Sequence, residues 1–321
     1  MAFSDAYYLL PFWIAVLVCL RCFVGTYTAV LLSSILFGGV ELMKARKTDD
    51  LIWNRLKKDV TIIGHRGCSL NAPENTIEAV QEAHKRGVKA VEFDIVLTRD
   101  NEPVVIHDFT VDRTTDGSGQ VGEMTWAEIK DLDASYKYTG PGSYNGVRVP
   151  HLKDMLKECK KHGLRAFLDI KGSQPFMMAR AIGEMAKEFP DLHEWAVVCS
   201  FYPQALIAMK WQYPQFSTIL TFRPHVLTLK DPDGPERNSE LWKKIAAPIA
   251  DYFLDLTIHN FWWYFCGANG FFMQEQEVSV SQLKYWRRRG MDVFVWTVNS
   301  PATKEYLRHL NAPYITDDCS G

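Results

Sequence analysis

Residues 86–96, Arg-Gly-Val-Lys-Ala-Val-Glu-Phe-Asp-Ile-Val, hold the pattern that decides the fold. Gly87 ends an amphipathic helical pattern, and a β-rich run follows at once from Ala90. The same order, a glycine stop and then a strand, recurs at Gly163 and Gly290. Helical patterns that alternate with short strands predict a parallel sheet with helices packed on it.

Runs that repeat this order are expected to form eight strands. They are Thr61–His65, Ala90–Val96, Arg165–Ile170, Trp195–Ser200, Ser217–Thr221, Tyr252–Leu256, Asp292–Val298 and Pro313–Thr316. Amphipathic helical patterns lie between them, for example at Thr76–Arg86, His151–His162, Phe176–Glu188, Leu241–Ala250 and Val280–Arg289.

A chain of 321 residues has room for one (β/α)8 barrel, which takes about 250 residues, and a short additional segment. We therefore predict an α/β protein whose residues 61–321 form a (β/α)8 TIM barrel. A doubly wound open sheet is the alternative. It is disfavoured because no Gly-x-Gly-x-x-Gly phosphate loop follows the first expected strand.

The alternation is interrupted after the second expected strand. Residues 97–103 form a polar turn that leads into Val104–Asp108, which is typical of a β-hairpin rather than of a β/α unit. Residues 109–150 are rich in Gly, Asp, Thr and Tyr and contain one short helical pattern, Trp126–Leu132. We expect an insertion over the barrel mouth, because loops of this length are usually functional or disordered.

The composition excludes several classes of protein. Hydrophobic residues make up 47% of the chain and charged residues 23%, an ordinary globular mixture that excludes a disordered chain. A net charge of −2 gives no basic field for broad nucleic-acid binding. The seven cysteines are scattered. We therefore expect no zinc site and no disulfide framework, but free and mostly buried thiols.

Residues 1–47 are expected to be a membrane anchor. Residues 7–40 are almost continuously apolar, and Arg21 is the only charge among them. A single helix of this length would measure about 50 Å, more than the ~30 Å hydrocarbon core of a bilayer. The run therefore forms one span after an interfacial piece, or a hairpin of two segments. A cleaved signal peptide is the rival, but no basic segment precedes the run.

The sequence leaves the membrane side of the barrel open. Lys44, Arg46 and Lys47 follow the apolar run, which for a single span favours a cytosolic barrel. That rule is weak for large domains, which can cross a membrane regardless of flanking charge. The chain contains no Asn-x-Ser/Thr glycosylation sequon. Residues 48–60 are expected to be a linker or a short helix.

A second unusual stretch covers residues 252–273 and contains Phe-Trp-Trp-Tyr-Phe-Cys at 261–266 and Phe-Phe-Met at 271–273. It is too short and too polar at its flanks to span a membrane. It is either a buried core helix or an aromatic wedge at the membrane interface, where Trp and Tyr favour the depth of the lipid headgroups. We prefer the wedge, because the expected anchor already holds the domain at a membrane.

Chemically useful side chains gather at the ends of three expected strands. In a barrel these carboxyl ends meet at one mouth. Alternation in the second strand puts Glu92 and Asp94 on one face, and the third strand carries Asp169 and Lys171 in the same way. Three converging carboxylates repel one another unless a cation lies between them, and all-oxygen ligation favours a hard divalent ion, Mg²⁺ before Ca²⁺. Either group alone could instead be a solvated edge or an ordinary ion pair.

Cationic and titratable groups surround this expected metal site. The first strand ends in Gly-His-Arg-Gly at 64–67, which adds His65 and Arg66. Arg66 and Lys171 next to a hard metal suit a phosphate group. His65 and His107 suit a general acid and a general base near neutral pH. By itself, His107 would indicate a structural residue sooner than a catalytic one.

Seven ordered motifs resemble the glycerophosphodiester phosphodiesterase family over residues 61–318. They are His-Arg-Gly at 65–67, Ala-Pro-Glu-Asn-Thr at 72–76, Glu-Phe-Asp at 92–94, Val-Ile-His-Asp at 105–108, Leu-Asp-Ile-Lys at 168–171, Trp-Thr-Val-Asn at 296–299 and Ile-Thr-Asp at 315–317. Residues 111–117, 197–201 and 254–273 and the apolar N-terminus are similar to membrane-bound animal members.

The resemblance implies a phospholipase-C-like (β/α)8 barrel, the metal ligands Glu92, Asp94 and Asp169, and catalytic His65 and His107. It implies phosphate contacts for Arg66 and Lys171. The third ligand is commonly Glu in the family, and the shorter Asp169 could alter the position of the metal. Glu74 and Asn75 would position His65, or Asn75 would be the N-cap of the helix that follows. Trp296 would line the pocket or fill the barrel.

The implied reaction converts a glycerophosphodiester, such as glycerophosphoinositol or glycerophospho-N-acylethanolamine, to glycerol 3-phosphate and an alcohol. His107 is assigned as base and His65 as acid, although the sequence gives no distances to check this. A lysophospholipase D or sphingomyelinase D-like enzyme on the same barrel is the first alternative. A non-catalytic membrane interaction protein is the second. The family implies a barrel on the lumenal or extracellular face, and lipid as its membrane partner.

Overall fold

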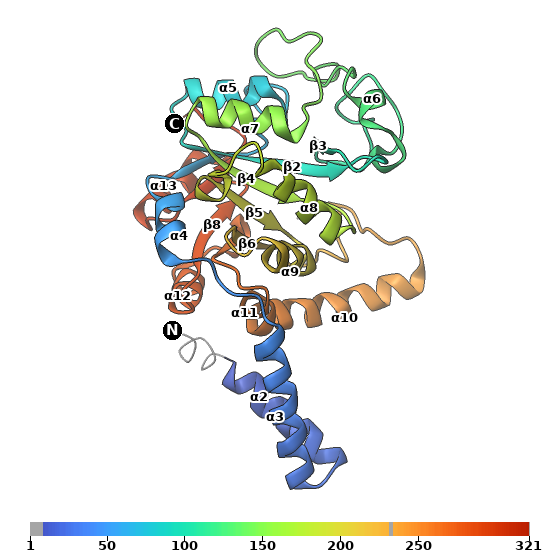
Figure 1. The fold of residues 1–321 in the computed structure, drawn as a ribbon, viewed down its shortest axis with the longest axis vertical. Coiled ribbons are helices and arrows are strands. Elements are labelled where there is room, and N and C mark those ends of the chain that lie inside the picture. The colour runs from blue at the N-terminus through green and yellow to red at the C-terminus, as the bar shows by residue number, and fades with distance from the viewer. Residues whose placement is uncertain (1–8, 231–233, 321) are drawn as a thin grey trace.

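The computed structural model describes residues 9–230 and 234–320, and in them a closed barrel forms the body of the molecule (Figure 1). β1 pairs with both β2 and β9, which closes a ring of parallel strands. The strands of this ring are β1 (Ile62–Gly64), β2 (Ala90–Leu97), β4 (Arg165–Ile170), β5 (Ala196–Ser200), β6 (Ser217–Phe222), β7 (Gly270–Gln274), β8 (Asp292–Trp296) and β9 (Tyr314–Thr316). The predicted TIM barrel is confirmed.

Helices cover the outside of the ring because each has one apolar face. α7 shows the pattern clearly, since Leu152, Met155, Leu156 and Cys159 are buried at helical spacing. The helices that follow the strands are α5 (Ile77–Lys85), α7 (Leu152–Lys161), α8 (Pro175–Met185), α9 (Pro203–Gln212), α10 (Leu241–Thr257), α12 (Val280–Arg288) and α13 (Pro301–His309).

One predicted strand is wrong, and one strand was missed. Residues 252–256, expected to be a strand, lie within α10. The strand at this place in the barrel is β7, Gly270–Gln274. In the segment as folded, Ile249, Tyr252, Phe253 and Leu256 are exposed together at spacings of three and four residues. That is the period of a helix, although aromatic and branched residues favour strands on average.

The predicted hairpin after the second strand is confirmed. β3 (Pro103–Val105) pairs antiparallel with β2 through Ile95 and Val105. The insertion that follows, residues 109–150, contains the short helices η1 (Val121–Glu123) and α6 (Trp126–Ile129). It has a small core of its own, in which Val111, Val121 and Ile129 pack under the hairpin.

Residues 48–60 are more than a linker. They contain α4 (Asp50–Lys57), whose Trp53 and Leu56 are buried with Phe294 in the cluster that fills the barrel. The indole Nε1–H of Trp53 donates to Asp292 Oδ2 at the start of β8 over 2.6 Å. α4 is therefore part of the barrel domain.

The N-terminal apolar region forms a helical hairpin, α2 (Leu10–Phe23) and α3 (Thr26–Met43), which projects from the barrel (Figure 1). Among the described residues, one helix, α3, is long and apolar enough to cross a membrane, and α2 is shorter. The two helices fold as a hairpin, and both arrangements that the sequence allowed stay compatible with a single span at α3. The first two residues of the predicted apolar run, Tyr7 and Tyr8, lie outside the described residues.

The second half of the aromatic stretch at 252–273 is mostly buried. After α10 come a π-helical turn, η3 (Ile258–Trp262), and α11 (Trp263–Phe265). Trp263 and Tyr264 are buried, and residues 271–273 are buried in β7. The predicted aromatic wedge is therefore wrong for Trp263 and Tyr264, which are buried in α11, and for residues 271–273, whose side chains are buried in β7.

The expectation of free cysteines is wrong at one pair. Cys68 and Cys319 form a disulfide, with their Cα atoms 5.9 Å apart. Their separation of 251 positions and the odd total of seven cysteines gave no sign of this pairing in the sequence. The remaining cysteines are free, and Cys159, Cys199 and Cys266 are buried, as expected.

Candidate active site

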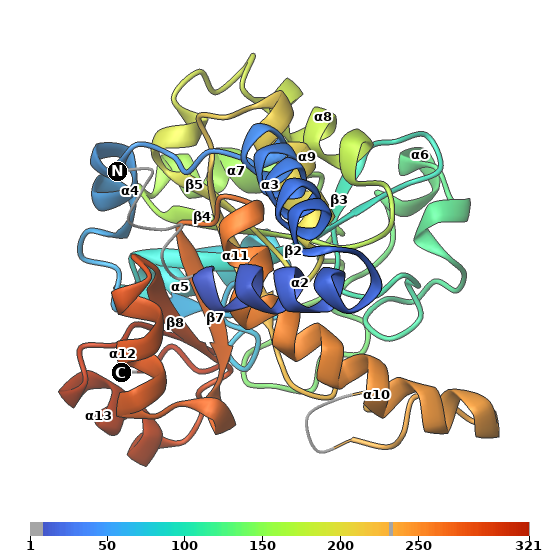
Figure 2. The same ribbon diagram turned by 90° about the horizontal axis from the view of Figure 1, so that it is seen from below.

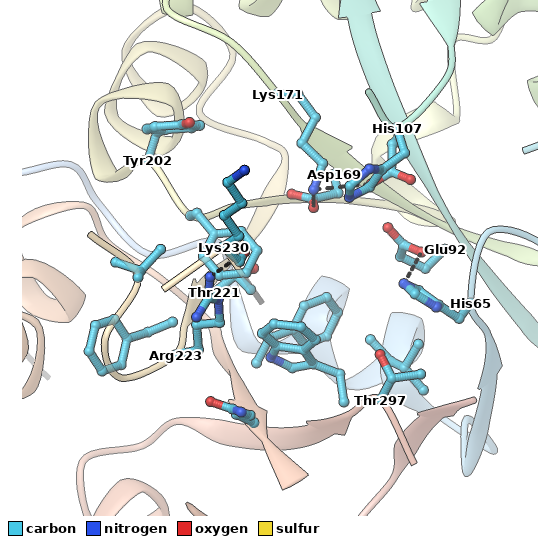
Figure 3. Close-up of a pocket in the computed structure, with 18 of the residues that line it drawn as sticks. His65, Glu92, His107, Asp169, Lys171, Tyr202, Thr221, Arg223, Lys230 and Thr297 are labelled. Carbon is cyan, nitrogen blue, oxygen red and sulfur yellow. Dashed lines mark hydrogen bonds and ion pairs between the residues drawn. The ribbon is translucent and has the colours of Figure 1, made fainter. Parts of the chain in front are cut away.

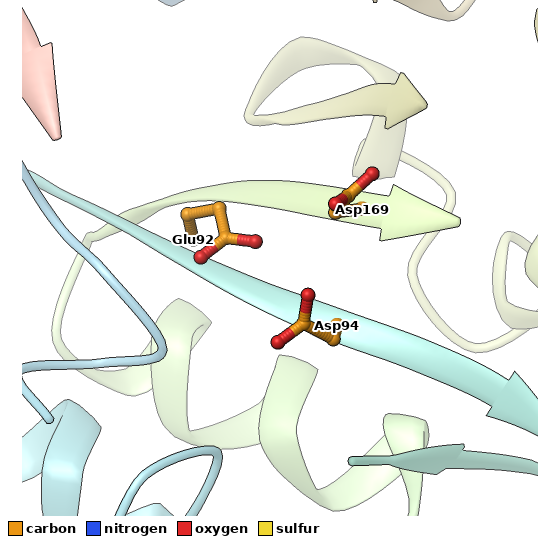
Figure 4. A group of neighbouring side chains, drawn as sticks. All are labelled: Glu92, Asp94 and Asp169. Carbon is orange, nitrogen blue, oxygen red and sulfur yellow. The ribbon is translucent and has the colours of Figure 1, made fainter. Parts of the chain in front are cut away.

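Three carboxylates meet at the ends of β2 and β4, as predicted (Figure 4). The register of the two strands pairs Asp94 with Asp169, and Glu92 lies two residues earlier on the same face of β2. One carboxylate oxygen from each side chain lies within 4.8 Å of the others, and all three residues are buried. The parallel sheet thus brings residues 77 positions apart in the sequence to one point.

The pKa values of these carboxyls reflect their burial and mutual repulsion. Burial raises the pKa of Glu92 well above its ordinary range, and the charges of Asp94 and Asp169 raise it further. Burial raises the pKa of Asp169 as well. Burial also acts to raise the pKa of Asp94, but the charges of Lys171, His107 and Arg66 outweigh it and hold that pKa below its ordinary value. Such a site favours an additional positive charge.

Two cationic side chains touch the carboxylates. Lys171 Nζ lies 2.6 Å from Asp169 Oδ2 and 3.1 Å from Asp94 Oδ1. Arg66 Nε lies 3.5 Å from Asp94 Oδ2. Burial acts to lower the pKa of Lys171, yet the charges of Asp169 and Asp94 raise it above its usual range. Three carboxylates against two cations leave one negative charge unbalanced in a buried place.

The donor set fits a hard divalent cation. Asp169 Oδ1 is buried and has no hydrogen-bond partner among the described residues, so a strong acceptor is left over where a ligand atom would be needed. All the ligand atoms that Glu92, Asp94 and Asp169 offer are carboxylate oxygens, which suit Mg²⁺ or Ca²⁺. These three residues would hold the ion.

His65 is held by a carboxylate from the other end of the chain. Its Nδ1 lies 2.6 Å from Asp317 Oδ1, just after β9. Burial acts to raise the pKa of Asp317, but the hydrogen bond and the charge of His65 keep it below its ordinary range. The ionised carboxylate only accepts, so the proton of the neutral imidazole lies on Nδ1. Nε2 is left toward the metal site, 4.0 Å from Glu92 Oε2 (Figure 3).

His107 has the same kind of partner, this time the next residue. Its Nδ1 lies 2.6 Å from Asp108 Oδ1. That hydrogen bond is the main reason why the pKa of Asp108 lies below its ordinary range. Because Nδ1 of His107 is bound to Asp108, its Nε2 is the ring nitrogen that can contact a substrate. Both imidazoles line the same pocket as the three carboxylates (Figure 3).

A chain of ion pairs joins the His107–Asp108 pair to Arg66, the residue after His65. Arg113, from the insertion, donates to Asp108 Oδ2 over 2.5 Å and through both terminal nitrogens to Glu74, over 2.8 and 2.7 Å. Glu74 Oε1 also accepts from Arg66 Nη1 over 2.9 Å. Arg113 of the insertion thus links Asp108, the partner of His107, to Arg66 through Glu74.

Asn75 holds a carboxylate and does not cap a helix, contrary to one of the two predictions for it. Its Nδ2 donates to Asp94 Oδ2 over 2.9 Å, and its Oδ1 accepts from the Asp94 backbone N–H over 3.1 Å. Thr76 is the N-cap of α5. Glu74 hydrogen-bonds to Arg66 and Asn75 to Asp94, and neither contact reaches His65 directly. A φ of 59° at Asn75 allows this pairing and excludes the extended backbone of a typical cap.

The loop that carries His65 is tightly constrained. Arg66 has a φ of 51°, and its backbone N–H donates to Glu92 Oε2 over 3.0 Å. A Cβ on Gly67, where φ is 92°, would lie 2.5 Å from the Cβ of Ala79. Only glycine fits there, so the loop can press against α5. The disulfide of Cys68 then ties this loop to the segment of Asp317.

The site opens into a cavity of about 960 Å³ (Figure 3). Trp296 both lines this cavity and packs against the core of the barrel, so the two predictions for it hold together. Its ring meets Phe201 edge to face, with centroids 5.4 Å apart. Farther along the chain, the lining combines the apolar side chains of Val226, Leu254 and Ile258 with cationic ones. The cationic residues are Arg223, Lys230 and Arg237.

All ten predicted site residues come together: Glu74 and Asn75 support the others, and the remaining eight line the cavity. The sequence analysis did not assign Asp108, Arg113 and Asp317 to the site. Asp108 and Asp317 stand inside quoted motifs, directly after His107 and Thr316, which was a usable signal. Arg113 had none beyond its place in the insertion.

The amino-acid sequence of the chain is similar to that of known phosphodiesterases. Residues 65–320 match the model of the glycerophosphoryl diester phosphodiesterase family. The chain is 40% identical to mouse glycerophosphodiester phosphodiesterase 1 over 81% of its length and 80% of the mouse protein. It is 39% identical to the human protein over 80% and 78%. A putative enzyme of this kind from Bacillus subtilis is 31% identical, over 80% and 93%.

Solved structures share the fold. A putative glycerophosphoryl diester phosphodiesterase from Silicibacter pomeroyi superposes with a TM-score of 0.63 at 24% identity, covering 81% of this chain and 90% of its own. A phosphodiesterase from Oleispira antarctica gives a TM-score of 0.62 at 22% identity, covering 81% and 94%.

Proposed function

This chain belongs to the glycerophosphodiester phosphodiesterase family, and from that premise we propose that it cleaves its diester with a divalent cation and two histidines. The family match and the 40% identity establish a phosphoric diester hydrolase, which sets aside a non-catalytic membrane protein. The observation that carries the proposal is the buried carboxylate group of Glu92, Asp94 and Asp169 between two carboxylate-held histidines.

The charges of the site suit a phosphodiester. A divalent ion on the three carboxylates would reverse the single negative excess to a single positive one, and one diester group would balance it. When bound, the ion supplies charge stabilisation to a phosphoryl oxygen and to a glycerol hydroxyl. Arg66 and Lys171 contact the remaining phosphoryl oxygens and are fixed beforehand by their ion pairs.

The two histidines move the protons. Asp108 and Asp317 hold the Nδ1 protons, so each Nε2 is free to exchange a proton with the substrate. His107, with Nε2 unprotonated, takes the proton of the attacking oxygen. His65, which for this role carries a second proton on Nε2, gives that proton to the departing alcohol. The attacking oxygen belongs to water or to the 2-hydroxyl of the glycerol, in which case water then opens a cyclic phosphate. Either route yields glycerol 3-phosphate and an alcohol.

Glycerophosphoinositol and glycerophospho-N-acylethanolamine are the substrates proposed. The Oleispira antarctica relative is described as a complex with the product sn-glycerol-3-phosphate, which supports the glycerol 3-phosphate half. The apolar wall at Val226, Leu254 and Ile258 favours contact with an acyl chain. That wall keeps a lysophospholipase D or sphingomyelinase D-like activity as the second candidate.

The enzyme is proposed to be anchored in a membrane by α2 and α3, with its barrel in an oxidising compartment. α3 has the length and hydropathy of a span. The disulfide between Cys68 and Cys319 lies beside the active site, and disulfides persist mainly in lumenal and extracellular spaces. This observation supports the lumenal or extracellular face over the cytosolic side that the basic residues after the apolar run favoured.

Identification of the products of glycerophosphoinositol by phosphorus NMR tests the proposal. Glycerol 3-phosphate together with free inositol is expected. Inositol phosphate together with free glycerol would show that the other ester bond is cut and that the glycerol side does not bind at the metal. A parallel assay with a lysophospholipid ranks the two candidate substrates by kcat/KM.

A further inference from the structure

Helix α10 carries an unusual apolar stripe on its outer side. On a helix of 100° per residue, seven large side chains fall within one third of the circumference, and all are exposed. Ile245 is 61% exposed, Ile249 56% and Tyr252 66%. The seven, which we name the α10 stripe, are Leu241, Trp242, Ile245, Ile249, Tyr252, Phe253 and Leu256.

The orientation of α10 is fixed by its inner side. Asp251 is 6% exposed, and its carboxylate accepts hydrogen bonds from the backbone of Leu227 and from the backbone and hydroxyl of Thr228, over 2.9, 3.0 and 2.7 Å. Leu254, also on the inner side, lines the active-site cavity. The helix therefore turns a charged residue inward and its largest apolar residues outward, the reverse of a helix that covers a soluble domain.

The stripe lies next to the proposed membrane hairpin. Figures 1 and 2 agree that α10 runs across the direction of α3, beside the place where the hairpin leaves the barrel. Phe261, just after α10, packs against Phe12 of α2 with ring centroids 5.6 Å apart. The Ala45 backbone N–H, just after α3, donates to Phe265 O over 2.8 Å. The apolar surface of the hairpin is thus continuous with the end of α10.

We propose that α10 lies in the plane of the bilayer with the α10 stripe in contact with lipid, as a second membrane attachment of the barrel. With α3 across the bilayer, α10 lies at its surface, because α10 runs across the direction of α3 and its C-terminal end lies beside the barrel end of α3 (Figures 1 and 2). An amphipathic helix with Trp, Tyr and Phe on one face is typical of this position. The attachment is apolar, since Lys243 and Lys244 are engaged by Glu240 and Glu236.

This contact bears on the active site. The loop before α10 supplies Leu227 to the cavity wall, the inner side of α10 supplies Leu254, and the start of η3 supplies Ile258. The bilayer would hold this wall in place and present the cavity mouth at the level of the lipid headgroups. The inference rests on the membrane position of the hairpin in the proposed function, and the experiment separates the two.

The test places a fluorophore on the full-length enzyme in phosphatidylcholine vesicles. Cys19 and Cys22 are exposed and are replaced by serine, and a single cysteine is then introduced and labelled with an NBD group. Ile249→Cys reports on the stripe. Ala250→Cys, the exposed neighbour that points away from the stripe, is the matched control, and Ile35→Cys reports on α3. Quenching by lipids that carry a nitroxide near the headgroup is measured.

Strong quenching at position 249, at least about threefold above that at position 250 and unchanged by 1 M salt, is expected. Quenching at position 35 without quenching at 249 would overturn the α10 proposal and leave the hairpin in place. No quenching at either position would remove the membrane position itself. Self-quenching at 249 that disappears on dilution with unlabelled enzyme would show that a second copy covers the stripe, and would also overturn the proposal.

An activity assay on unlabelled variants tests the same contact. Ile245→Glu combined with Ile249→Glu puts two charges on the stripe, and Ala246→Glu combined with Ala250→Glu puts the same charges beside it. The first variant is expected to lose at least about fivefold in rate on a lysophospholipid held in vesicles, and to keep its rate on soluble glycerophosphoinositol. Equal effects of the two variants would contradict the contact. Loss of the soluble rate in both would point to misfolding and is checked by thermal unfolding.

Discussion

At the scale of the residue, the site consists of groups that are each fixed by a second group. Asp317 illustrates this, because it accepts hydrogen bonds from His65, from Ser69 Oγ over 2.6 Å and from Asn299 Nδ2 over 2.6 Å. The sequence could predict the reacting residues, since strand alternation and barrel topology bring them to one mouth. It could not predict Asp317 as a partner of His65, because 252 positions separate the two and only the closure of β9 on β1 joins them.

Replacement of Asp317 by Asn should lower kcat by at least about 100-fold with little change in KM. The amide removes the negative charge that stabilises the doubly protonated imidazole of His65, so the form that can donate a proton from Nε2 is less favoured. Steady-state kinetics over a range of pH measure this. Ser69→Ala removes another donor to the same oxygen and is the control. A tenfold or smaller effect of Asp317→Asn would assign the residue to structure.

Replacement of Asp169 by Asn should abolish activity and the stabilisation of the fold by added metal. The amide removes one charge and one strong ligand from a set of three, and binding of metal to the native state alone is what stabilises it. Thermal unfolding with and without 5 mM Mg²⁺ is the measurement, with the exposed Asp100→Asn as control. An unchanged metal-dependent shift in Tm would contradict the ligand assignment.

At the scale of the element, the sequence pattern predicted the helices that bury one apolar face against the barrel. Glycines 87, 163 and 290 end their helices with positive φ, as predicted. The error at residues 252–256 has a physical cause: an exposed apolar stripe looks like a buried one in sequence, and aromatic residues are common in strands. The sequence could not show that the apolar face of α10 is exposed. In the structure, no part of the described chain covers that face.

Lys210 on α9 should make stability depend on pH. Burial lowers the pKa of its ammonium to about 7, and its Nζ lies within 2.6 Å of Thr48 Oγ1 and 3.0 Å of Phe216 O. Between about pH 7 and 10.4 the unfolded chain binds a proton that the native state does not, so the free energy of unfolding rises with pH, by up to about 1.4 kcal/mol per unit.

Urea unfolding at several pH values compares the enzyme with Lys210→Met. The variant should lose this rise with pH above neutrality, although its stability at any one pH also reflects the lost hydrogen bonds. The exposed Lys58→Met is a control for changes in net charge. Identical slopes in the enzyme and in Lys210→Met would show that Lys210 stays charged through this range.

At the scale of the whole molecule, one covalent link joins the beginning and the end of the barrel. Cys68 follows β1 and Cys319 follows β9, and the segments they tie carry His65 and Asp317. The barrel itself followed from the repeated strand and helix patterns, whereas this link did not. No local pattern marks either cysteine, and only the meeting of the first and last strands brings them together.

Cys68→Ala should lower the free energy of unfolding by about 2–5 kcal/mol, because the bond removes the closure entropy of a very long loop from the unfolded chain. Urea unfolding under non-reducing conditions measures it. Cys68→Ala combined with Cys319→Ala should lose about the same amount, and the buried free cysteine variant Cys159→Ser serves as a control. A clearly larger loss in the double variant than in the single would show that the two sulfurs act separately.

The release of glycerol 3-phosphate from glycerophosphoinositol by the purified enzyme, with added Mg²⁺, with Ca²⁺ and with EDTA, tests the central claim most directly. The carboxylates of Glu92, Asp94 and Asp169 predict release with one or both cations and loss of at least about 100-fold in EDTA, restored by added metal. Release at the same rate in EDTA, from folded protein freed of metal, would contradict a metal-dependent phosphodiesterase and leave the histidines to act without it.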